Sequence, residues 1–487
     1  NNTFGDFGPP INTDYHPTEL YASKYKYLGT NNHFWMGLLS TATYVKSENL
    51  SISGGIDLRS YQGEHYREVY DLVGGDYTLD IDPNGVNNYN DESPVKKVGD
   101  KIFYHDLGKV NWGGVFGQAE YKKDLWSVFV SASGSVSAYN GVDYFRKRTL
   151  DIDGETLEIG YDDVVTHKGI NYDRNSAGLK TYETGWKTIP GYTIKTGANY
   201  LINEFSNVFV NLGYLNNAPK FKYVIDRENN FVNNFKNEKV QAAELGFSYT
   251  KKKLAIDVNA YFTNWQDRPE VIGGIVDEEG EPLSANILMD ARHLGAEFEF
   301  AYNVTRKLTL EGVISVGDWT WQSKKDSITF ENQAGNKATD EFGNIKYVSF
   351  DATGVHVGDA AQTQLGASLK YNITRRIYFK TRYTWFDRYY SAFEPTSLNG
   401  VNSRRESWQI PSYGIMDVHM GGSFLFNKKF PVSIRLSILN ALDEIYIADA
   451  QNNGEYPNPK FKDFDANSAI VFFGQGRRFN ASIQLKF

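Results

Sequence analysis

Segments in which apolar and polar residues alternate dominate the chain. The last nine residues, FNASIQLKF, place Phe479 and Ile483 at odd positions and Asn480 and Gln484 at even ones. The same period of two recurs in about fifteen segments, among them 126–136, 254–262, 293–302, 364–371, 377–385, 416–424 and 432–439. Because successive side chains of a β-strand point to opposite faces, each segment is predicted to be a strand with one apolar and one polar face.

The connections between these segments alternate between short and long. The short ones are 46–49, 122–124, 203–206, 250–253, 304–306, 373–375 and 427–429. The long ones, rich in Asn, Asp, Gly and Tyr, cover roughly 69–107, 148–184, 222–238, 268–285, 326–358, 394–410 and 447–474. Transmembrane β-barrels have short periplasmic turns and long outer loops. We therefore predict an all-β, antiparallel transmembrane barrel. The alternative is a soluble β-protein whose strands each have one face exposed to water.

Ionisable residues recur on the polar side of the predicted strands. Nine of them are Glu120, Glu244, Asp257, Glu297, Glu299, Glu311, Arg382, Asp417 and Arg435. A dry apolar interior would not tolerate so many charges without partners. The inside of the predicted barrel is therefore expected to hold water or polar protein, and these nine residues are expected to line it.

Composition and motifs narrow the functional classes. The 487 residues include no cysteine, which excludes disulfides and thiolate chemistry, and the net charge of −8 argues against a nucleic-acid partner. No run of 18 apolar residues occurs, so no transmembrane helix is predicted, and the N-terminal residues show no signal peptide. The eight histidines are scattered and no HExxH, GxSxG or P-loop motif is present, so the protein is not expected to be an enzyme.

Five stretches resemble, in the same order, the C-terminal barrel of TonB-dependent outer-membrane transporters, especially those of Bacteroidetes-type bacteria. They are VFGQAEYKKDLWSVFVSASGS (115–135), NEFSNVFVNLGYLNNAPKF (203–221), NEKVQAAELGFSYTKKKLAIDVNAYFTNWQDRPE (237–270), LSILNALDEIYIADAQNN (436–453) and FFGQGRRFNASIQLKF (472–487). The resemblance implies a 22-stranded barrel around a plug. Residues 31–487 would form strands 8 to 22 of that barrel, residues 1–30 would be part of an extracellular loop, and the long extracellular loops would include 69–107, 148–184, 326–358 and 447–474.

The resemblance also implies a function. Such a barrel takes up a scarce, bulky ligand, for example a siderophore or another metal chelate, cobalamin or an oligosaccharide, across the outer membrane of a Gram-negative bacterium. The energy would come from TonB acting on an N-terminal plug. The plug and the first strands are not recognisable in this sequence, so we expect the chain to be part of a longer or cleaved polypeptide. A surface lipoprotein is a partner that related glycan importers have.

Two other classes fit the same pattern of strands. One is a passive porin-like channel, and the other is a structural barrel that holds a larger outer-membrane complex together without transporting anything. In the family that the chain resembles, the terminal aromatic strand also serves as a signal for barrel assembly. Deleting Phe487 is therefore expected to lower the amount of assembled protein.

Two motifs that combine aromatic residues with arginine stand where a predicted strand leaves the membrane outward, WQDRPE (265–270) and WFDRYY (385–390). Their candidate ligand contacts are Trp265, Asp267, Arg268, Trp385, Arg388 and Tyr389. Aromatic rings and arginine together stack on and hydrogen-bond polar ligands. The alternative is an interfacial girdle of aromatic residues with arginines reaching to the headgroups.

The segment DIDPNGVNNYND (80–91) resembles the spacing of a calcium-binding loop. Asp80, Asp82, Asn84 and Asp91 would supply oxygen ligands. Against this reading stand a proline at position 83, an aspartate in place of the usual final glutamate, and strands in place of the flanking helices. A solvated polar loop is the alternative, and no other cofactor is predicted. The inward pair Glu297 and Glu299 could imitate a glycosidase pair, but contact with a plug accounts for it better.

Overall fold

The computed structural model describes residues 9–82, 85–226, 229–233, 235–276, 282–330, 337–340, 342–426, 429–452, 466 and 469–486. In these residues the regular structure is β-strand, apart from the 3-10 turns η1 (Phe221–Tyr223), η2 (Pro395–Ser397) and η3 (Gly400–Asn402). Within the same ranges, no helix has the length and apolar character needed to cross a membrane.

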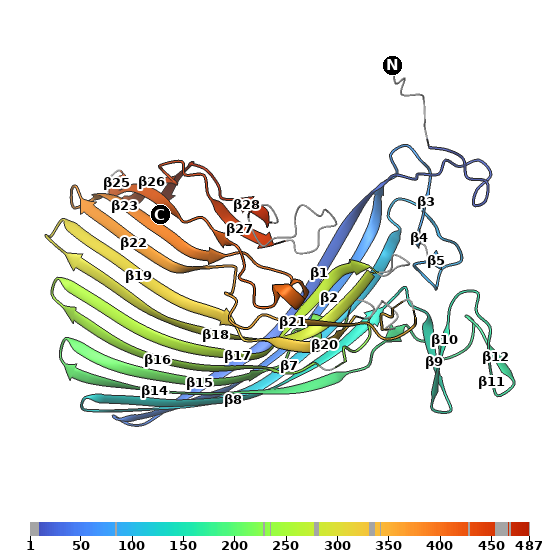
Figure 1. Ribbon diagram of the computed structural model, residues 1–487, viewed down its shortest axis with the longest axis horizontal. Coiled ribbons are helices and arrows are strands. Elements are labelled where there is room, and N and C mark those ends of the chain that lie inside the picture. The colour runs from blue at the N-terminus through green and yellow to red at the C-terminus, as the bar shows by residue number, and fades with distance from the viewer. Residues whose placement is uncertain are drawn as a thin grey trace, which may run out of the picture.

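Fifteen long strands form one antiparallel sheet (Figure 1). The sheet has 17 strands in total, of which β13 (Tyr182–Glu183) and β24 (Gln409–Ile410) are two residues long. The long ones are, in order across the sheet, β1 (Lys26–Ser47), β2 (Leu50–Asp71), β7 (Lys101–Lys123), β8 (Trp126–Asp143), β14 (Lys187–Asn203), β15 (Ser206–Asn217), β16 (Glu238–Lys251), β17 (Leu254–Val276), β18 (Pro282–Asn303), β19 (Leu308–Trp321), β22 (Ala361–Asn372), β23 (Ile377–Tyr390), β25 (Tyr413–Phe426), β26 (Phe430–Leu439) and β29 (Arg478–Leu485). The predicted all-β class and the number of strands are confirmed.

The two ends of the sheet differ, because tight turns join the strands at one end and long connections join them at the other (Figure 1). The long connections contain small two-stranded ribbons of their own. These are β3 (Thr78–Leu79) with β6 (Val95–Lys96), β4 (Ile81–Asp82) with β5 (Gly85–Val86), β9 (Arg148–Ile152) with β10 (Glu155–Ile159), β11 (Val165–His167) with β12 (Ile170–Tyr172), β20 (Lys324–Thr329) with β21 (Tyr347–Asp351), and β27 (Ile447–Asn452) with β28 (Ala469–Phe473). The end of the sheet that carries the long connections therefore has regular secondary structure of its own.

The register defines an apolar face and a polar face of the sheet. Residues directly opposite each other on antiparallel strands share a face, so the pairings trace each face from strand to strand. Val115, Ile194 and Leu245 share the apolar face, and 61, 51 and 62% of their surfaces are exposed. Apolar side chains exposed in this way, with polar side chains on the other face, are typical of a barrel wall that meets lipid outside.

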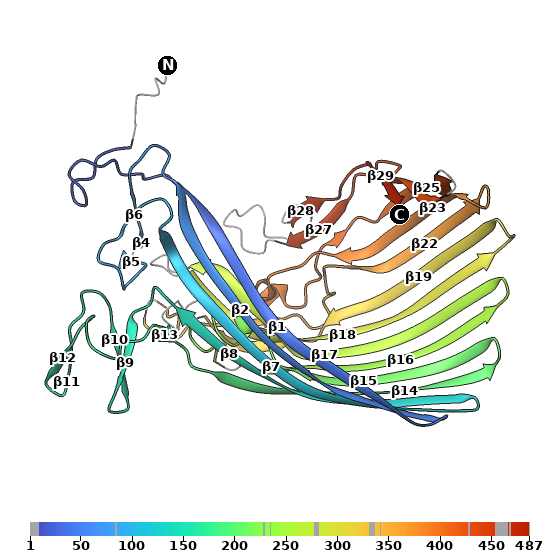
Figure 2. The ribbon, with the colours of Figure 1, turned by 180° about the vertical axis from the view of Figure 1, so that it is seen from behind.

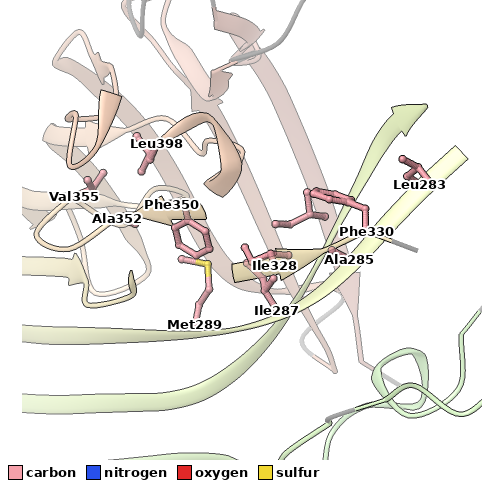
Figure 3. Packing of buried hydrophobic residues seen from close by; sticks show 11 residues of the cluster. Leu283, Ala285, Ile287, Met289, Ile328, Phe330, Phe350, Ala352, Val355 and Leu398 are labelled. Atoms are coloured by element: carbon pink, nitrogen blue, oxygen red, sulfur yellow. The ribbon is translucent and has the colours of Figure 1, made fainter. Parts of the chain in front are cut away.

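The connection expected at 268–285 is shorter in the structure, since β17 continues to Val276 and β18 starts at Pro282. The ribbon persists because its apolar side chains are buried against other long connections. Figure 3 shows this cluster, in which Met289 of β18 points toward Phe350 of β21. Its buried members are Ile272, Leu283, Ala285, Ile287, Met289, Ile328, Phe330, Phe350, Ala352, Val355 and Leu398. We call it the loop core, and it fixes several connections to one another.

The edge strands β1 and β29 are each paired on one side only in the described part of the chain. Figure 2 shows the sheet as an open trough. Leu38 and Leu39 lie on opposite faces of β1 and are 56 and 66% exposed, and Phe479 and Ile483 of β29 are each 73% exposed. Backbone groups left unpaired in lipid are costly. A closed barrel therefore requires further strands between β29 and β1.

Candidate functional site

All nine ionisable residues predicted to line the interior lie on the polar face. The register places them opposite polar or small partners on that face, for example Glu311 opposite Ser368 and Arg435 opposite Ser482. Glu120 is opposite Phe129, which lies on the same face. Their contact with a plug stays a prediction.

Four of these nine residues take part in ion pairs with other residues of the wall. The Lys380 Nζ lies 2.8 Å from a carboxylate oxygen of Glu311, which also accepts a hydrogen bond from the Ser368 hydroxyl at 3.0 Å. An Arg382 guanidinium nitrogen lies 2.8 Å from the Asp417 carboxylate. The fourth is Glu120, whose carboxylate lies 2.8 Å from the ammonium of Lys122 on the same strand. These charges are balanced within the wall.

A second group of charges on the polar face is not balanced. Asp257 and Glu299 lie directly opposite each other, and Glu297 lies opposite Asn259 one step further along β17 and β18. Glu297 accepts a hydrogen bond from the Ser315 hydroxyl at 3.3 Å. None of the three carboxylates has an ion pair among the residues that the structure describes. Like charges directly opposite each other are destabilising, so this acidic group favours a cationic partner facing the wall.

The first aromatic–arginine motif contains a β-bulge. The register of β17 and β18 shifts between Trp265 and Arg268, and Asp267 has a φ of 55°. The shift brings Trp265 and Arg268 onto the polar face, although they are three residues apart. Asp267 points to the apolar side, where the Nζ atoms of Lys236 and Lys239 lie 3.5 and 3.2 Å from its carboxylate. The bulge therefore separates Asp267 from the other two candidates.

The second motif is arranged differently. Trp385 lies opposite Leu365 on the apolar face, which is the girdle position. Arg388 has a φ of 51° and donates a hydrogen bond to the Gly317 carbonyl oxygen at 2.8 Å. The Tyr389 side chain is 7% exposed, and its hydroxyl donates to the Ala448 carbonyl oxygen at 3.0 Å, beneath the β27–β28 ribbon. The three candidates of this motif therefore make separate contacts, with the apolar face, the β19 backbone and the β27–β28 ribbon.

An aromatic cluster on the polar face joins Trp265 to residues that sequence reasoning missed. The imidazole of His293 lies 6.2 Å from the Trp265 ring and stacks on the Trp319 ring at 5.4 Å. The Trp319 indole N–H donates to the Tyr261 hydroxyl at 2.9 Å. We call Tyr261, Trp265, His293 and Trp319 the wall cluster. The four residues lie on the polar face of the neighbouring strands β17, β18 and β19. Knowing which residues of these strands pair would have brought them together as a candidate site.

The wall cluster carries two polar atoms without a partner. The Trp265 Nε1 and the His293 Nε2 are buried, and neither makes a hydrogen bond to any residue that the structure describes. Arg268 lies nearby, with its guanidinium 5.5 Å from the centre of the Trp321 ring. Buried polar groups are almost always satisfied in native proteins. The cluster therefore offers stacking surface and hydrogen-bonding groups to whatever fills the barrel at this level.

The proposed calcium ligands are only partly described. Asn84 and the side chain of Asp82 lie outside the described residues. Asp80 is buried, and its Oδ1 accepts hydrogen bonds from Asn87 at 2.7 Å and from the backbone N–H of Phe103 at 2.9 Å. Burial raises the pKa of Asp80 above its ordinary value. Asp91 pairs with the ammonium of Lys96. No cluster of three metal-binding groups occurs in the described ranges, and calcium stays a prediction.

A curved antiparallel sheet with an apolar outer face and a polar inner face is the wall of a transmembrane β-barrel. A family model described as "TonB dependent receptor-like, beta-barrel" matches residues 1–441. The chain belongs to this family. Its barrels lie in the outer membrane of Gram-negative bacteria and are receptors rather than enzymes. A search among curated proteins finds no match.

Several solved structures share the fold. "Copper transporter OprC" has a TM-score of 0.57 at 13% identity, over 94% of this chain and 57% of that one. The ferric yersiniabactin uptake receptor FyuA from Yersinia pestis has 0.54 at 11%, over 95 and 56%. The ferric citrate transporter FecA has 0.53 at 11%, over 96 and 56%. The chain thus spans little more than half the length of these proteins. The bacterial group stays a prediction.

Proposed function

We propose that this chain is the greater part of the barrel of a TonB-dependent transporter that takes up a scarce, bulky ligand across the outer membrane. The observation that carries the proposal is the family match over residues 1–441, on a sheet whose inner face is polar. TonB would act through an N-terminal plug. A Bacteroidetes-type source and a surface lipoprotein over the long connections belong to the same proposal.

The wall cluster and Arg268 support ligand contact on the inner wall. Aromatic rings bind flat or ring-shaped ligand faces, and the Trp265 Nε1 and His293 Nε2 make no hydrogen bond within the described part of the chain. Iron or copper chelates, cobalamin and oligosaccharides all present such faces together with polar groups. The names of the structural neighbours favour a metal-linked ligand, and we place that class first.

The acidic group of Asp257, Glu297 and Glu299 supports a polar plug inside the barrel. A plug that presents lysine or arginine to this part of the wall would remove the repulsion between Asp257 and Glu299, which lie opposite each other. This contact is the proposed docking surface for the plug.

Uptake of a panel of labelled ligands by cells tests the proposal. The panel contains ferric and cupric chelates, cobalamin and oligosaccharides, and the cells have the gene intact or deleted, with or without TonB. Saturable uptake that needs both the protein and TonB supports a TonB-dependent transporter. Uptake that needs the protein but not TonB would identify a passive channel. Loss of a large outer-membrane complex on deletion, with no change in uptake of any ligand, would identify a structural barrel.

Two tryptophan variants separate ligand contact from folding. Trp319→Leu removes the stacking partner of His293 on the polar face, whereas Trp385→Leu removes a tryptophan from the apolar face. The first is expected to weaken ligand binding about tenfold at normal protein levels, because a stacked aromatic contact with its buried area is worth about 1–2 kcal/mol. The second is expected to leave affinity unchanged. Equal affinities in both variants would remove the wall cluster from the ligand site.

A further inference from the structure

The apolar face of the sheet carries a groove. Its volume is about 360 Å³, and it lies over β14, β15, β16 and β17. Thr196, Leu212, Ala243 and Phe262 form one continuous row across it, since each lies opposite the next. The small side chains of Thr196 and Ala243 leave room between the larger ones. Its size falls within the range of about 300–1,000 Å³ that small-molecule sites occupy.

The side chains above this row become steadily more polar toward the long-connection end. The next row contains Ile194, Tyr214, Gln241, Asn264 and Arg292, again opposite one another in turn. The row after that contains Tyr192, Asn216, Lys239 and Gln266. The Tyr192 and Tyr214 rings stack with centroids 5.9 Å apart. An apolar groove that leads through tyrosines to cations matches the order of chain, interface and headgroup in a lipid.

The charges at the polar end leave a positive surplus. Lys236 and Lys239 share one carboxylate, that of Asp267, at 3.5 and 3.2 Å. Asp290 accepts the Asp267 backbone N–H at 2.8 Å and adds a second carboxylate. Arg292 is exposed on the same face and has no ion pair among the described residues. Three cations thus face two carboxylates, which suits one added anionic group.

We propose that this groove binds one phosphate-bearing lipid of the outer leaflet, with an acyl chain along Leu212, Ala243 and Phe262. Lys236, Lys239 and Arg292 bind its phosphate, and the stacked tyrosines lie at the level where chain and headgroup meet. The site rests on the membrane position of the barrel and not on what the barrel transports. Loss of transport would leave it intact.

The experiment measures lipid retention by the full-length protein, purified in mild detergent, by native mass spectrometry. Three probes are added in turn: lipid A, lipid A from which the phosphates have been removed, and inorganic phosphate. One lipid A molecule is expected to bind per protein, about tenfold more tightly than its dephosphorylated form, because hydrogen bonds to charged groups are among the stronger ones in proteins. Inorganic phosphate is expected not to compete at equal concentration.

Variants divide the site into headgroup and chain. The double variant Lys236→Gln/Lys239→Gln is expected to abolish the tenfold preference for the phosphorylated probe while the dephosphorylated probe binds as before. Its charge-matched control is the double variant Lys168→Gln/Lys180→Gln, which changes two exposed lysines that lie 2.8 Å from Asp153 and 3.6 Å from Asp151 in a different connection. Ala243→Leu and Thr196→Leu each fill the groove and are expected to weaken both lipid probes. Their control, Ala296→Leu, adds the same bulk on the apolar face of β18, outside the groove.

The heat-dependent gel shift of each variant confirms that the barrel has folded. Two groove-filling variants are used, so that the test still stands if one of them fails to fold. Equal binding of phosphorylated and dephosphorylated lipid to the unchanged protein would overturn the headgroup assignment. Full binding to both groove-filling variants would overturn the chain assignment. Competition by inorganic phosphate at equal concentration would show an anion site without a lipid, and would also overturn the proposal.

Discussion

A single carboxylate ties two of the long connections together. The Arg404 Nε lies 2.8 Å from Asp351 Oδ2, and the backbone N–H of Thr353 donates to Asp351 Oδ1 at 3.0 Å. Burial acts to raise the pKa of Asp351, but the hydrogen bonds from Thr353 and Arg404 outweigh it and lower the pKa to about 2. A depressed carboxylate pKa stabilises the folded state above the ordinary value near 4, and this stabilisation is lost as the pH falls through about 2.

Asp351→Asn is therefore expected to loosen the β20–β21 ribbon at neutral pH by about 1 kcal/mol, since Arg404 is largely exposed and water screens the pair. Hydrogen exchange of the amides of 347–352, corrected for the intrinsic effect of pH, measures this at pH 6 and pH 3. The difference between variant and wild type should shrink at pH 3. Asp151→Asn, in an exposed ribbon, is the control. A constant difference at both pH values would contradict the role of the charge.

The position of most polar-face residues could be predicted from the sequence, whereas the composition of the candidate site could not. Asp257, Glu297 and Arg382 lie in regular strands, where the period of two fixes the face. The bulge between Trp265 and Arg268 breaks that period by one residue, and the residues around it give no sequence signal for a bulge. His293 was not singled out, because its partners come from two other strands. Contacts between strands depend on register, which a single segment does not contain.

At the scale of elements, the long connections are held by packing as well as by backbone pairing. The outer parts of β17 and β18 fall within the predicted connection 268–285, a stretch rich in Gly, Asp and Glu. They are strand because Ile272 of β17 and Ile287 of β18 are buried in the loop core. Tertiary burial overrides local propensity here.

Leu398 tests whether the loop core organises the mouth of the barrel. It is 1% exposed and lies in the loop core with Phe350 and Val355, which come from a different connection. Leu398→Ala is expected to cost about 2–4 kcal/mol within the connections, because it leaves a cavity. Hydrogen exchange should quicken in β20 and β21, while the melting temperature of the sheet stays the same. The control, Val401→Ala, changes a fully exposed side chain three residues away. Unchanged exchange in Leu398→Ala would contradict the role of the loop core.

At the scale of the whole molecule, the acidic group of Asp257, Glu297 and Glu299 on the inner wall favours contact with a cationic plug. Glu299→Gln is expected to have opposite effects with and without a plug. In protein from which the plug has been deleted, the change removes the repulsion from Asp257 and raises stability by about 0.2–1 kcal/mol. In the complete protein, it removes a contact with the plug and lowers stability by a similar amount. Thermal unfolding of both forms measures the reversal. Glu120→Gln, whose carboxylate is already paired with Lys122, should show no reversal. The same sign for Glu299→Gln in both forms would contradict docking at this wall.

The open edges of the sheet lead to the last prediction. In a closed barrel every strand has two neighbours, so the backbone of β1 and β29 must be as well paired as that of a central strand. In the complete protein, the amides of 34–42 in β1 and 479–483 in β29 are therefore expected to exchange as slowly as those of 208–212 in the central strand β15. Hydrogen exchange with mass spectrometry measures all three segments in one sample, so β15 is an internal control. When the present chain is expressed alone, the two edge segments should exchange much faster than β15. Rapid exchange of β1 and β29 in the complete protein would mean that other strands do not close the sheet, and would leave a structural role in a larger assembly as the better account.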